Sequence, residues 1–161
     1  MDKRLRYIII ICVIFIGLLL LPKIKILFEG EMGRIKRVIY AAKTATERED
    51  LFKCISFISQ SYTDKYGNDR RSLLAVGKNV FEIYNDIAIS IRELDISLDT
   101  DTAEAEVQAT VVARNVERKE TNIFETDTVK FLIFFKKEEG AWKVIKLEFL
   151  EPQQILPPGI S

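Results

Sequence analysis

The chain has 161 residues, which is enough for one domain and a short appendage. Its 24 Lys and Arg residues balance 24 Asp and Glu residues, so no net charge attracts nucleic acid and no nucleic-acid partner is expected. Histidine is absent, and the two cysteines, Cys12 and Cys54, form no paired metal motif, so neither a metal site nor a cofactor is expected. Cys54 alone lies outside the apolar N-terminal run and is interpreted as a small core residue.

Residues 1–28 are interpreted as a membrane anchor. The uncharged apolar run 8–21 follows a positively charged start and is short for a spanning helix, which needs about 20 residues. It extends to Phe28 if Lys23 and Lys25 reach toward the lipid headgroups. Because no small-residue cleavage site follows the run, an uncleaved anchor is preferred over a cleaved signal peptide or a buried core helix.

The charges on the two sides of this run give opposite signals for orientation. The positive N-terminus favours retention of that end in the cytoplasm. Lys and Arg residues also follow the run, and they count the other way: Lys23, Lys25, Arg34, Lys36 and Arg37. We expect the N-terminus inside and the following domain exported.

Two amphipathic helices are expected after the anchor. The apolar face of the first has helical spacing and consists of Ile35, Val38, Ile39 and Ala42. Thr46 followed by Glu49 has the form of a capping box, which predicts that a second helix begins there. The apolar face of this second helix is Leu51, Cys54, Ile55 and Ile58, and residues 59–61 end it.

A turn, a third helix and a long strand follow without an intervening loop. Asp64, Gly67 and Asn68 signal the turn, and Asn68 or Asp69 caps the helix. The apolar positions of the helix are Leu73, Val76, Val80, Phe81 and Tyr84. Gly77 in mid-helix costs about 1 kcal/mol relative to alanine, and close backbone packing would account for it.

The strand after 85–86 shows a slip in its alternation. Its apolar residues are Ile87, Ile89 and Ile91, then Leu94, Ile96 and Leu98. The parity changes between Ile91 and Leu94, so one extra residue near Arg92 and Glu93 is expected to form a β-bulge that bends the strand.

The second half is expected to be an antiparallel meander. Alternation of alanine and valine with polar residues over 102–113 predicts a strand with one wet face and one small-residue face, which lets a helix approach closely. The other expected elements are a turn at 99–101, a charged hairpin tip at 115–122, a strand at 127–136, a turn at 138–140, a strand at 141–150 and an extended Pro-rich tail at 152–161.

This order of elements resembles the nuclear transport factor 2-like, or cystatin-like, cone superfamily over about residues 30–150. The segments that carry the resemblance are Thr-Glu-Arg-Glu-Asp-Leu-Phe, Ile-Ser-Gln-Ser-Tyr-Thr-Asp, Gly-Asn-Asp-Arg-Arg-Ser-Leu-Leu and Gly-Ala-Trp-Lys-Val-Ile-Lys-Leu-Glu-Phe. It implies an α+β fold in which an N-terminal transmembrane helix precedes three helices packed on a curved antiparallel four-stranded sheet. The domains expected are the anchor (1–28), the cone domain (29–151) and the tail (152–161).

The same resemblance says less about activity, because this fold hosts enzymes, binding modules and assembly domains. Membrane-anchored bacterial members look similar to this chain and have no general assigned activity. The resemblance therefore implies a single-pass protein of a bacterial inner membrane, with its domain in the periplasm or outside the cell rather than in the cytoplasm.

The catalytic members of this family use an Asp base with a Tyr donor, or a His–Asp pair, and the absence of histidine excludes the second. The residues that we consider candidates for a pocket are Tyr62, Tyr66, Tyr84, Trp142 and Glu148. Glu148 fits a solvated strand face, and the tyrosines fit core packing with the hydroxyl at the rim. We assign no catalytic residue and prefer a non-catalytic role over an isomerase-like enzyme.

The strand 129–136 has apolar residues on both faces. Phe131, Ile133 and Phe135 point one way, and Leu132 and Phe134 point the other. Helices cover one face, so the other is expected to be an interface, unless the curl of the cone or the tail covers it. We therefore expect a membrane-anchored interaction or assembly domain that forms a homodimer or binds a protein partner. The alternative is a small apolar ligand in the cone pocket.

Overall fold

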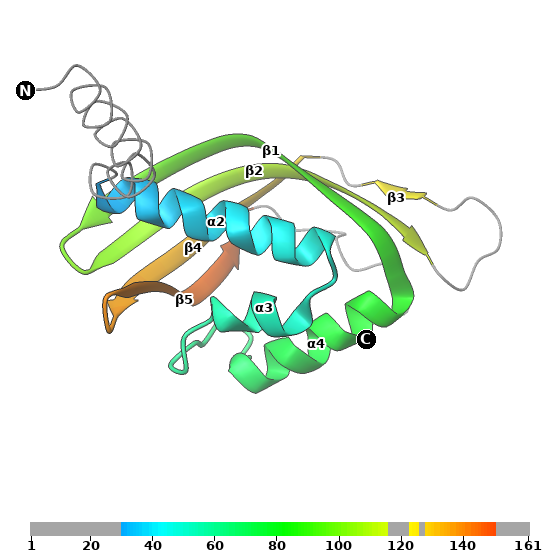
Figure 1. The fold of residues 1–161 in the computed structure, drawn as a ribbon, viewed down its shortest axis with the longest axis horizontal. Coiled ribbons are helices and arrows are strands. Elements are labelled where there is room, and N and C mark those ends of the chain that lie inside the picture. The colour runs from blue at the N-terminus through cyan, green and yellow to red at the C-terminus, as the bar shows by residue number, and fades with distance from the viewer. Residues whose placement is uncertain (1–29, 116–122, 126–127, 151–161) are drawn as a thin grey trace, which may run out of the picture. The chain divides into compact units, whose positions relative to one another are not determined.

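The computed structural model describes residues 30–115, 123–125 and 128–150. Three helices precede the sheet: α2 (Glu31–Glu47), α3 (Leu51–Ser56) and α4 (Arg70–Ile83). The strands are β1 (Tyr84–Asp99), β2 (Thr102–Asn115), β3 (Ile123–Glu125), β4 (Val129–Glu138) and β5 (Ala141–Phe149). The sheet is antiparallel with the order β1-β2-β4-β5, and β3 pairs with β2 off this path (Figure 1). The α+β prediction is therefore confirmed, although the short strand β3 was not predicted.

Three of the predicted segments lie outside the described residues: the anchor, most of the hairpin tip and the tail. Within the described ranges, no helix has both the length and the apolar character needed to cross a membrane. The described residues from Ile35 onward form one compact unit, and its helices and sheet enclose the main core.

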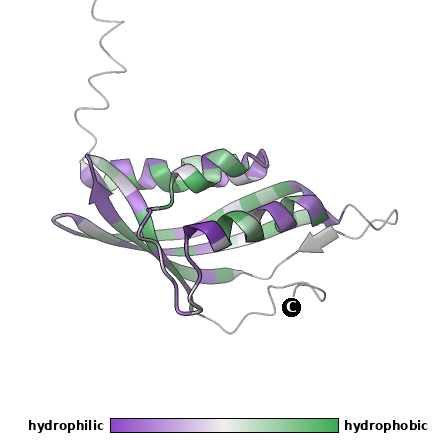
Figure 2. Cartoon of the chain, turned by 90° about the horizontal axis from the view of Figure 1, so that it is seen from below, coloured by the Kyte–Doolittle hydropathy of each residue, from purple (hydrophilic) through white to green (hydrophobic). Residues whose placement is uncertain are grey.

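Helix α2 packs on the small-residue face of β2. Ile35 is fully buried and Ile39 is 6% exposed, and both belong to the same core cluster as Ala103, Ala105 and Ala109. The short alanine side chains form part of the sheet face that this helix covers. Figure 2 shows hydrophobic and hydrophilic residues alternating along the helices and the strands, as the amphipathic pattern requires. The predicted first helix is confirmed.

The capping-box prediction at Thr46 was wrong. Thr46 lies in the last turn of α2, where its Oγ1 donates a hydrogen bond back to the Ala42 carbonyl at 3.0 Å. Glu49, with φ of 56°, breaks the helix, and Asp50 caps α3 by accepting from the Lys53 backbone N–H at 2.9 Å. A threonine side chain that bonds to its own preceding turn is not free to cap a new one.

The close packing suggested for Gly77 is confirmed. A Cβ atom at Gly77 would lie 2.7 Å from Cδ1 of Leu51, so α3 and α4 touch where no side chain fits between them. The cap of α4 is also as expected, because the Asp69 side chain accepts from the Ser72 N–H at 2.8 Å. Two predicted positions differ: Val76 is 44% exposed, and Tyr84 begins β1 instead of ending the helix.

The predicted bulge in β1 is present at the expected residue. Ile91 pairs with Ala109 and Glu93 pairs with Gln108, which leaves Arg92 as the extra residue. A second irregularity, between Asn85 and Ala88, was not predicted from the sequence. The bulges let β1 bend around the helices, which Figure 1 shows as the long curve of this strand.

A further bulge in β5 decides which of its side chains face the helices. Phe134 pairs with Lys146 and Phe135 pairs with Val144, so Ile145 is the extra residue. Val144 and Leu147 therefore both face the core, whereas Lys146 shares the outer face with Glu148.

Candidate functional site

An apolar cavity of about 280 Å³ lies between the helices and the inner face of the sheet. Helix α2 contributes Val38, Ile39, Ala42, Lys43 and Thr46, and α3 and the segment after it contribute Cys54, Phe57 and Ile58. The sheet contributes Ile89, Ile91, Val107, Ala109, Phe131, Ile133, Phe135, Val144 and Leu147. The bulge at Ile145 leaves Val144 and Leu147 both lining this space, whereas on β1 only Ile89 and Ile91, which precede the bulge at Arg92, line it.

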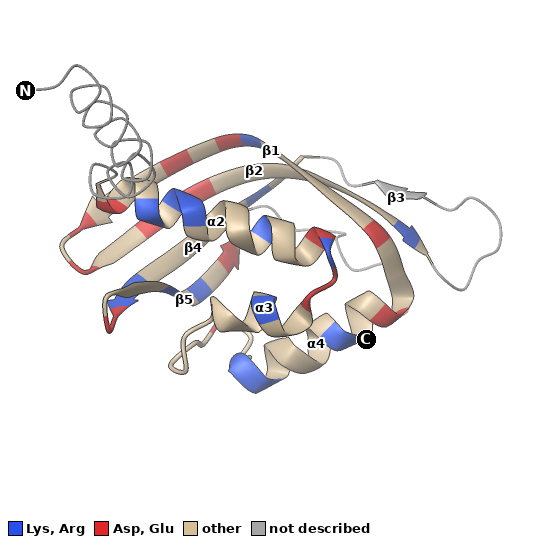
Figure 3. Cartoon of the chain, in the orientation of Figure 1, with Lys and Arg blue, Asp and Glu red and all other residues tan. Residues whose placement is uncertain are grey.

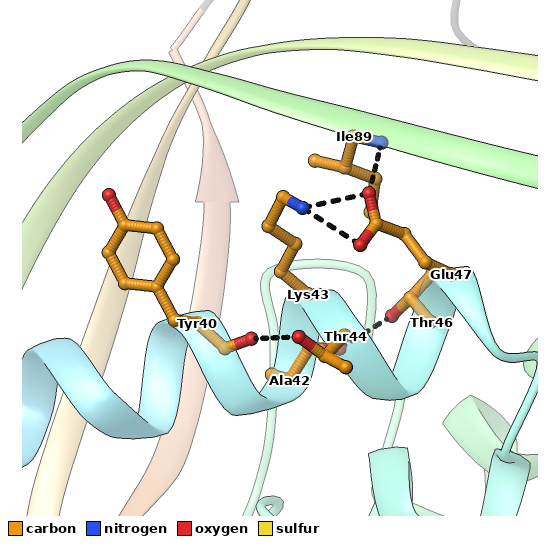
Figure 4. Close-up of polar contacts among 7 residues, drawn as sticks. All are labelled: Tyr40, Ala42, Lys43, Thr44, Thr46, Glu47 and Ile89. Carbon is orange, nitrogen blue, oxygen red and sulfur yellow. Dashed lines mark hydrogen bonds and ion pairs between the residues drawn. The ribbon is translucent and has the colours of Figure 1, made fainter.

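The polar side chains of the lining are all engaged with their own chain (Figure 4). Lys43 Nζ donates to both carboxylate oxygens of Glu47 at 2.8 Å. Thr46 Oγ1 donates to the Ala42 carbonyl at 3.0 Å and lies 3.6 Å from Cys54 Sγ. The described lining therefore offers a ligand contact area and no uncommitted charge.

Glu47 also ties the end of α2 to the edge strand β1. Its Oε1 accepts a hydrogen bond from the Ile89 backbone N–H at 2.9 Å, and Glu49 Oε1 accepts from the Asp86 N–H at 3.1 Å. Partial burial raises the pKa of Glu47, but the hydrogen bond from Ile89 and the contact with Lys43 outweigh it, so the net pKa lies below its ordinary value. The ionised carboxylate of Glu47 therefore links the end of α2 to β1 beside the cavity. We call this set of contacts among Lys43, Glu47 and Ile89 the clasp.

Cys54 is the thiol of the lining. Burial raises its pKa above the ordinary value, while the hydrogen bond with Thr46 acts in the opposite direction and is weaker. Because the thiolate is the nucleophilic form, a raised pKa keeps this side chain neutral and inert. Cys54 was interpreted as a small core residue, but it is only partly buried and lines the cavity instead of belonging to a core cluster.

The aromatic residues considered as pocket candidates lie elsewhere. Tyr62, which is 4% exposed, and Trp142, which is 3% exposed, belong to the main core cluster. Tyr84 is buried in a smaller cluster with Ile87 and Ala113. Tyr66 is 72% exposed at the turn before α4. None of the four lines the cavity.

Glu148 also lies outside the cavity lining. Its carboxylate is 2.6 Å from Lys146 Nζ on the outer face of the sheet, where both side chains are partly exposed. Tyr62 lies in the main core and does not line the cavity, and burial, aided by the charge of Asp64, raises its pKa to about 12. The structure therefore does not bring a candidate carboxylate and tyrosine together inside the cone.

The residues considered as interface candidates divide between the two faces of β4. Phe131, Ile133 and Phe135 line the cavity, and Leu132 and Phe134 face outward, half-buried. On the outer face of the sheet, Leu132 lies between Glu106 of β2 and Glu148 of β5. Phe134 lies between Glu104 of β2 and Lys146 of β5. Figure 3 shows that acidic residues predominate on β1 and β2, whereas basic residues are frequent on β4 and β5.

Several structures of other proteins share this arrangement. A ketosteroid isomerase-like protein from Erwinia carotovora atroseptica superposes with a TM-score of 0.60 at 19% identity, over 78% of this chain and 100% of its own. A protein of the nuclear transport factor 2-like family from Streptomyces avermitilis superposes with a TM-score of 0.63 at 12% identity, over 74% of this chain and 94% of its own. The fold is nuclear transport factor 2-like.

Bd1075 from Bdellovibrio bacteriovorus superposes with a TM-score of 0.60 at 16% identity over 71% of this chain, which spans only 39% of that longer protein. No family model matches the sequence, and no curated protein matches it. At these identities the likeness shows the nuclear transport factor 2-like fold and leaves the activity open.

The sequence analysis did not select Lys43 and Glu47, although the sequence contains a signal for their pairing. Lys43 and Glu47 are four residues apart, a spacing that pairs opposite charges on one helix face. The choice of candidates by ionisable type led instead to tyrosines and to Glu148. The cavity is built mainly from apolar residues, which the sequence indicates only as core.

Proposed function

We propose that this chain is a non-catalytic binding domain whose cone cavity holds a small, neutral, apolar ligand. One observation carries the proposal: the cavity of about 280 Å³ has an apolar wall in which Lys43 and Thr46 are already bound within the chain. Concave apolar sites with few polar groups are the usual form of small-molecule sites.

The volume sets the size of the ligand. An empty apolar cavity of about 150 Å³ binds benzene in another protein, so a cavity of nearly twice that volume fits a ligand of about two fused rings or a short branched chain. Contact with Phe131, Ile133 and Val107 would stabilise such a ligand by burying its surface, at about 25 cal/mol per Å².

The clasp at Lys43 argues for a ligand without charge. An anionic ligand would have to displace the Glu47 carboxylate from Lys43, and thereby weaken the hydrogen bond from Ile89. Separating a partly buried ion pair leaves an uncompensated charge, which costs more than the new contact returns. A neutral apolar ligand leaves the clasp closed.

The same groups favour binding without chemistry. Lys43 is held by Glu47, and burial raises the pKa of the Cys54 thiol. General-base or nucleophilic catalysis requires a group in its reactive form within reach of the ligand. Within the described lining, neither side chain meets that requirement.

Two fluorescent probes with the same ring system test the proposal on the full-length chain. Phenylnaphthylamine is neutral, and anilinonaphthalene sulfonate carries a sulfonate. We expect the neutral probe to bind the wild type at least about tenfold more tightly than the anion does. The substitution Ala109→Leu, which fills the cavity, should abolish neutral-probe binding. The matched change Ala113→Leu, at a buried position outside the cavity lining, should not.

The outer face of the sheet supports a second candidate function, which is association with another copy or a protein partner. On the β2 side, Leu132 and Phe134 pair with Glu106 and Glu104. On the β5 side they pair with Glu148 and Lys146, which form an ion pair, and basic residues are frequent on β4 and β5 as a whole (Figure 3). A twofold pairing of two such faces would place opposite charges together around the apolar centre. Phe134→Glu should release the partner in light scattering while the fold is kept, and Ile133→Glu should unfold the domain. A chain that stays monomeric at high concentration contradicts this candidate.

We also propose that residues 1–28 anchor the chain in a bacterial inner membrane, with the domain exported. The uncharged apolar run 8–21 and the absence of a small-residue cleavage site support this. Intact mass of the membrane-extracted protein should begin at Met1 or Asp2. A mature start after residue 22 contradicts the proposal.

A further inference from the structure

A second, polar cleft of about 420 Å³ lies where the end of α3 meets the turn between β4 and β5. Its charged side chains are Arg70 at the start of α4, Lys143 on β5, and Glu138 and Glu139 at the turn. None of the four lines the apolar cavity, so the charged groups of this cleft are separate from it, although Ile58 lines both spaces.

The two cations meet at the end of α3. Arg70 Nη2 donates to the Ile55 carbonyl at 3.3 Å, and Lys143 Nζ donates to the next carbonyl, that of Ser56, at 2.6 Å. Both positive groups therefore lie at the end of α3, and both side chains line the cleft. Cations at a helix C-terminus stabilise it, and this accounts for these two hydrogen bonds.

The hydrogen bond to the end of α3 uses Nη2 of Arg70 and leaves its Nε–H without a partner in the described part of the chain. Its Nε is buried and has no hydrogen-bond partner among the described residues. Leaving a buried donor without a partner is energetically unfavourable, so such a group calls for a water or another acceptor. Among the described residues, no carboxylate forms an ion pair with Arg70 or Lys143.

The two carboxylates of the cleft, Glu138 and Glu139, also have no ion-pair partner among the described residues. Glu138 Oε1 accepts a hydrogen bond from Ser59 Oγ at 2.7 Å, and Ser59 is 1% exposed, so this carboxylate is held in place. Glu139 is exposed on the turn. In the part of the chain that the structure describes, neither carboxylate forms an ion pair with a cation.

We propose that this cleft binds a small zwitterion of the amino-acid type. The ligand carboxylate lies against the positive groups of Arg70 and Lys143, which both line the cleft. The ligand ammonium lies toward Glu138 and Glu139. A ligand with both charges complements the whole cleft, whereas a simple anion would also meet the two carboxylates.

Thermal unfolding of the full-length chain, followed through the fluorescence of Trp142, the single tryptophan, tests the site. The probes are L-alanine, sodium acetate and methylammonium chloride. We expect L-alanine to raise the midpoint in a concentration-dependent way, and the two single-charge probes at equal concentration to shift it less. Arg70→Gln and Glu138→Gln should each weaken the apparent alanine affinity at least about tenfold.

Arg71→Gln is the matched control, because Arg71 is the exposed neighbour of Arg70 on the same helical turn and does not line the cleft. It should leave the alanine effect unchanged. A purely structural role of Arg70 would lower the midpoint of Arg70→Gln but keep its alanine-dependent rise, and this outcome overturns the proposal. Equal effects of acetate and L-alanine overturn it as well. If Arg70→Gln does not fold, Glu138→Gln decides by the same criteria.

Discussion

The carboxylate of Glu47 joins Lys43 on its own helix to the backbone N–H of Ile89 on the edge strand β1, at 2.8 and 2.9 Å. This contact fixes the end of α2 against the sheet beside the apolar cavity. An edge strand otherwise leaves such N–H groups to solvent. The clasp therefore stabilises both the helix and the wall of the site.

Replacing Glu47 with glutamine should destabilise the fold by about 1 kcal/mol at neutral pH, because the amide keeps an acceptor for Ile89 but loses the ion pair with Lys43. Urea unfolding of the two proteins measures the difference. The control is Glu82→Gln on α4, where the i,i+4 pair with Lys78 is 3.7 Å long and exposed. This control should change stability by less than about 0.5 kcal/mol. Equal losses in the two variants would argue against the clasp.

The contribution of Glu47 should also depend on pH. The pKa of Glu47 in the folded chain lies below its ordinary value of 4.5, so the folded state favours the ionised form. The stabilisation is then fully present above about pH 4.5 and is lost as the pH falls through the lower folded-state pKa. The stability difference between wild type and Glu47→Gln should shrink over this acidic range. A difference that stays constant down to about pH 3 contradicts the assignment.

Gly77→Ala should fail to give the stabilisation that alanine normally brings to a helix. The gain of about 1 kcal/mol in helix propensity is opposed by the contact of the new Cβ with Leu51. In a Leu51→Ala background the contact is gone, and the same change should stabilise by about 1 kcal/mol. A double-mutant cycle by urea unfolding gives the coupling. A coupling near zero would mean that Leu51 simply moves aside.

Ala109→Leu should be tolerated, with a change in unfolding free energy within about 1 kcal/mol, because the larger side chain enters the empty volume of the cavity. Ala113→Leu should cost about 1–3 kcal/mol of unfolding free energy, because Ala113 is 5% exposed in a packed cluster and does not line the cavity. Thermal unfolding of both variants provides the comparison. Equal costs at the two positions would indicate that the cavity is closed in solution.

The Tyr62 phenol should ionise late in an alkaline titration. Burial is the main cause that raises its pKa from 10.0 to about 12, and the Asp64 charge adds to it. Because the folded pKa is raised, the associated stability is fully present below about pH 10 and is lost as the pH rises through about 12. Ultraviolet absorbance should show a late phase that Tyr62→Phe removes. The change Tyr66→Phe, at a side chain that is 72% exposed, should leave that phase in place.

Local patterns in the sequence predicted those features that depend on the alternation of neighbouring residues. The parity change between Ile91 and Leu94 located the bulge at Arg92, and the alternation along β2 located its buried alanine face. These inferences succeed because each strand residue faces one side of the sheet, so an apolar pattern has a single consistent register.

Features that depend on competition between local contacts were missed. Thr46 had two ways to satisfy its hydroxyl, and the bond to the preceding turn prevailed over a new cap. The pairing of Phe134 with Lys146 and of Phe135 with Val144 shows a bulge in β5 that its sequence does not signal, because Val144 and Ile145 are both apolar. The cavity likewise depends on where packing between α2 and the sheet leaves space, and no short pattern records that.

Methyl NMR of the full-length chain during titration with phenylnaphthylamine tests the central claim most directly. The account predicts concentration-dependent shifts at the methyl groups of Ile89, Ile91 and Val107, which line the cavity, and little change at Leu132 on the outer face. Ala109→Leu should abolish these shifts. Shifts centred on Leu132, or no shift at any cavity methyl at saturating probe, would contradict a ligand-binding role for the cavity.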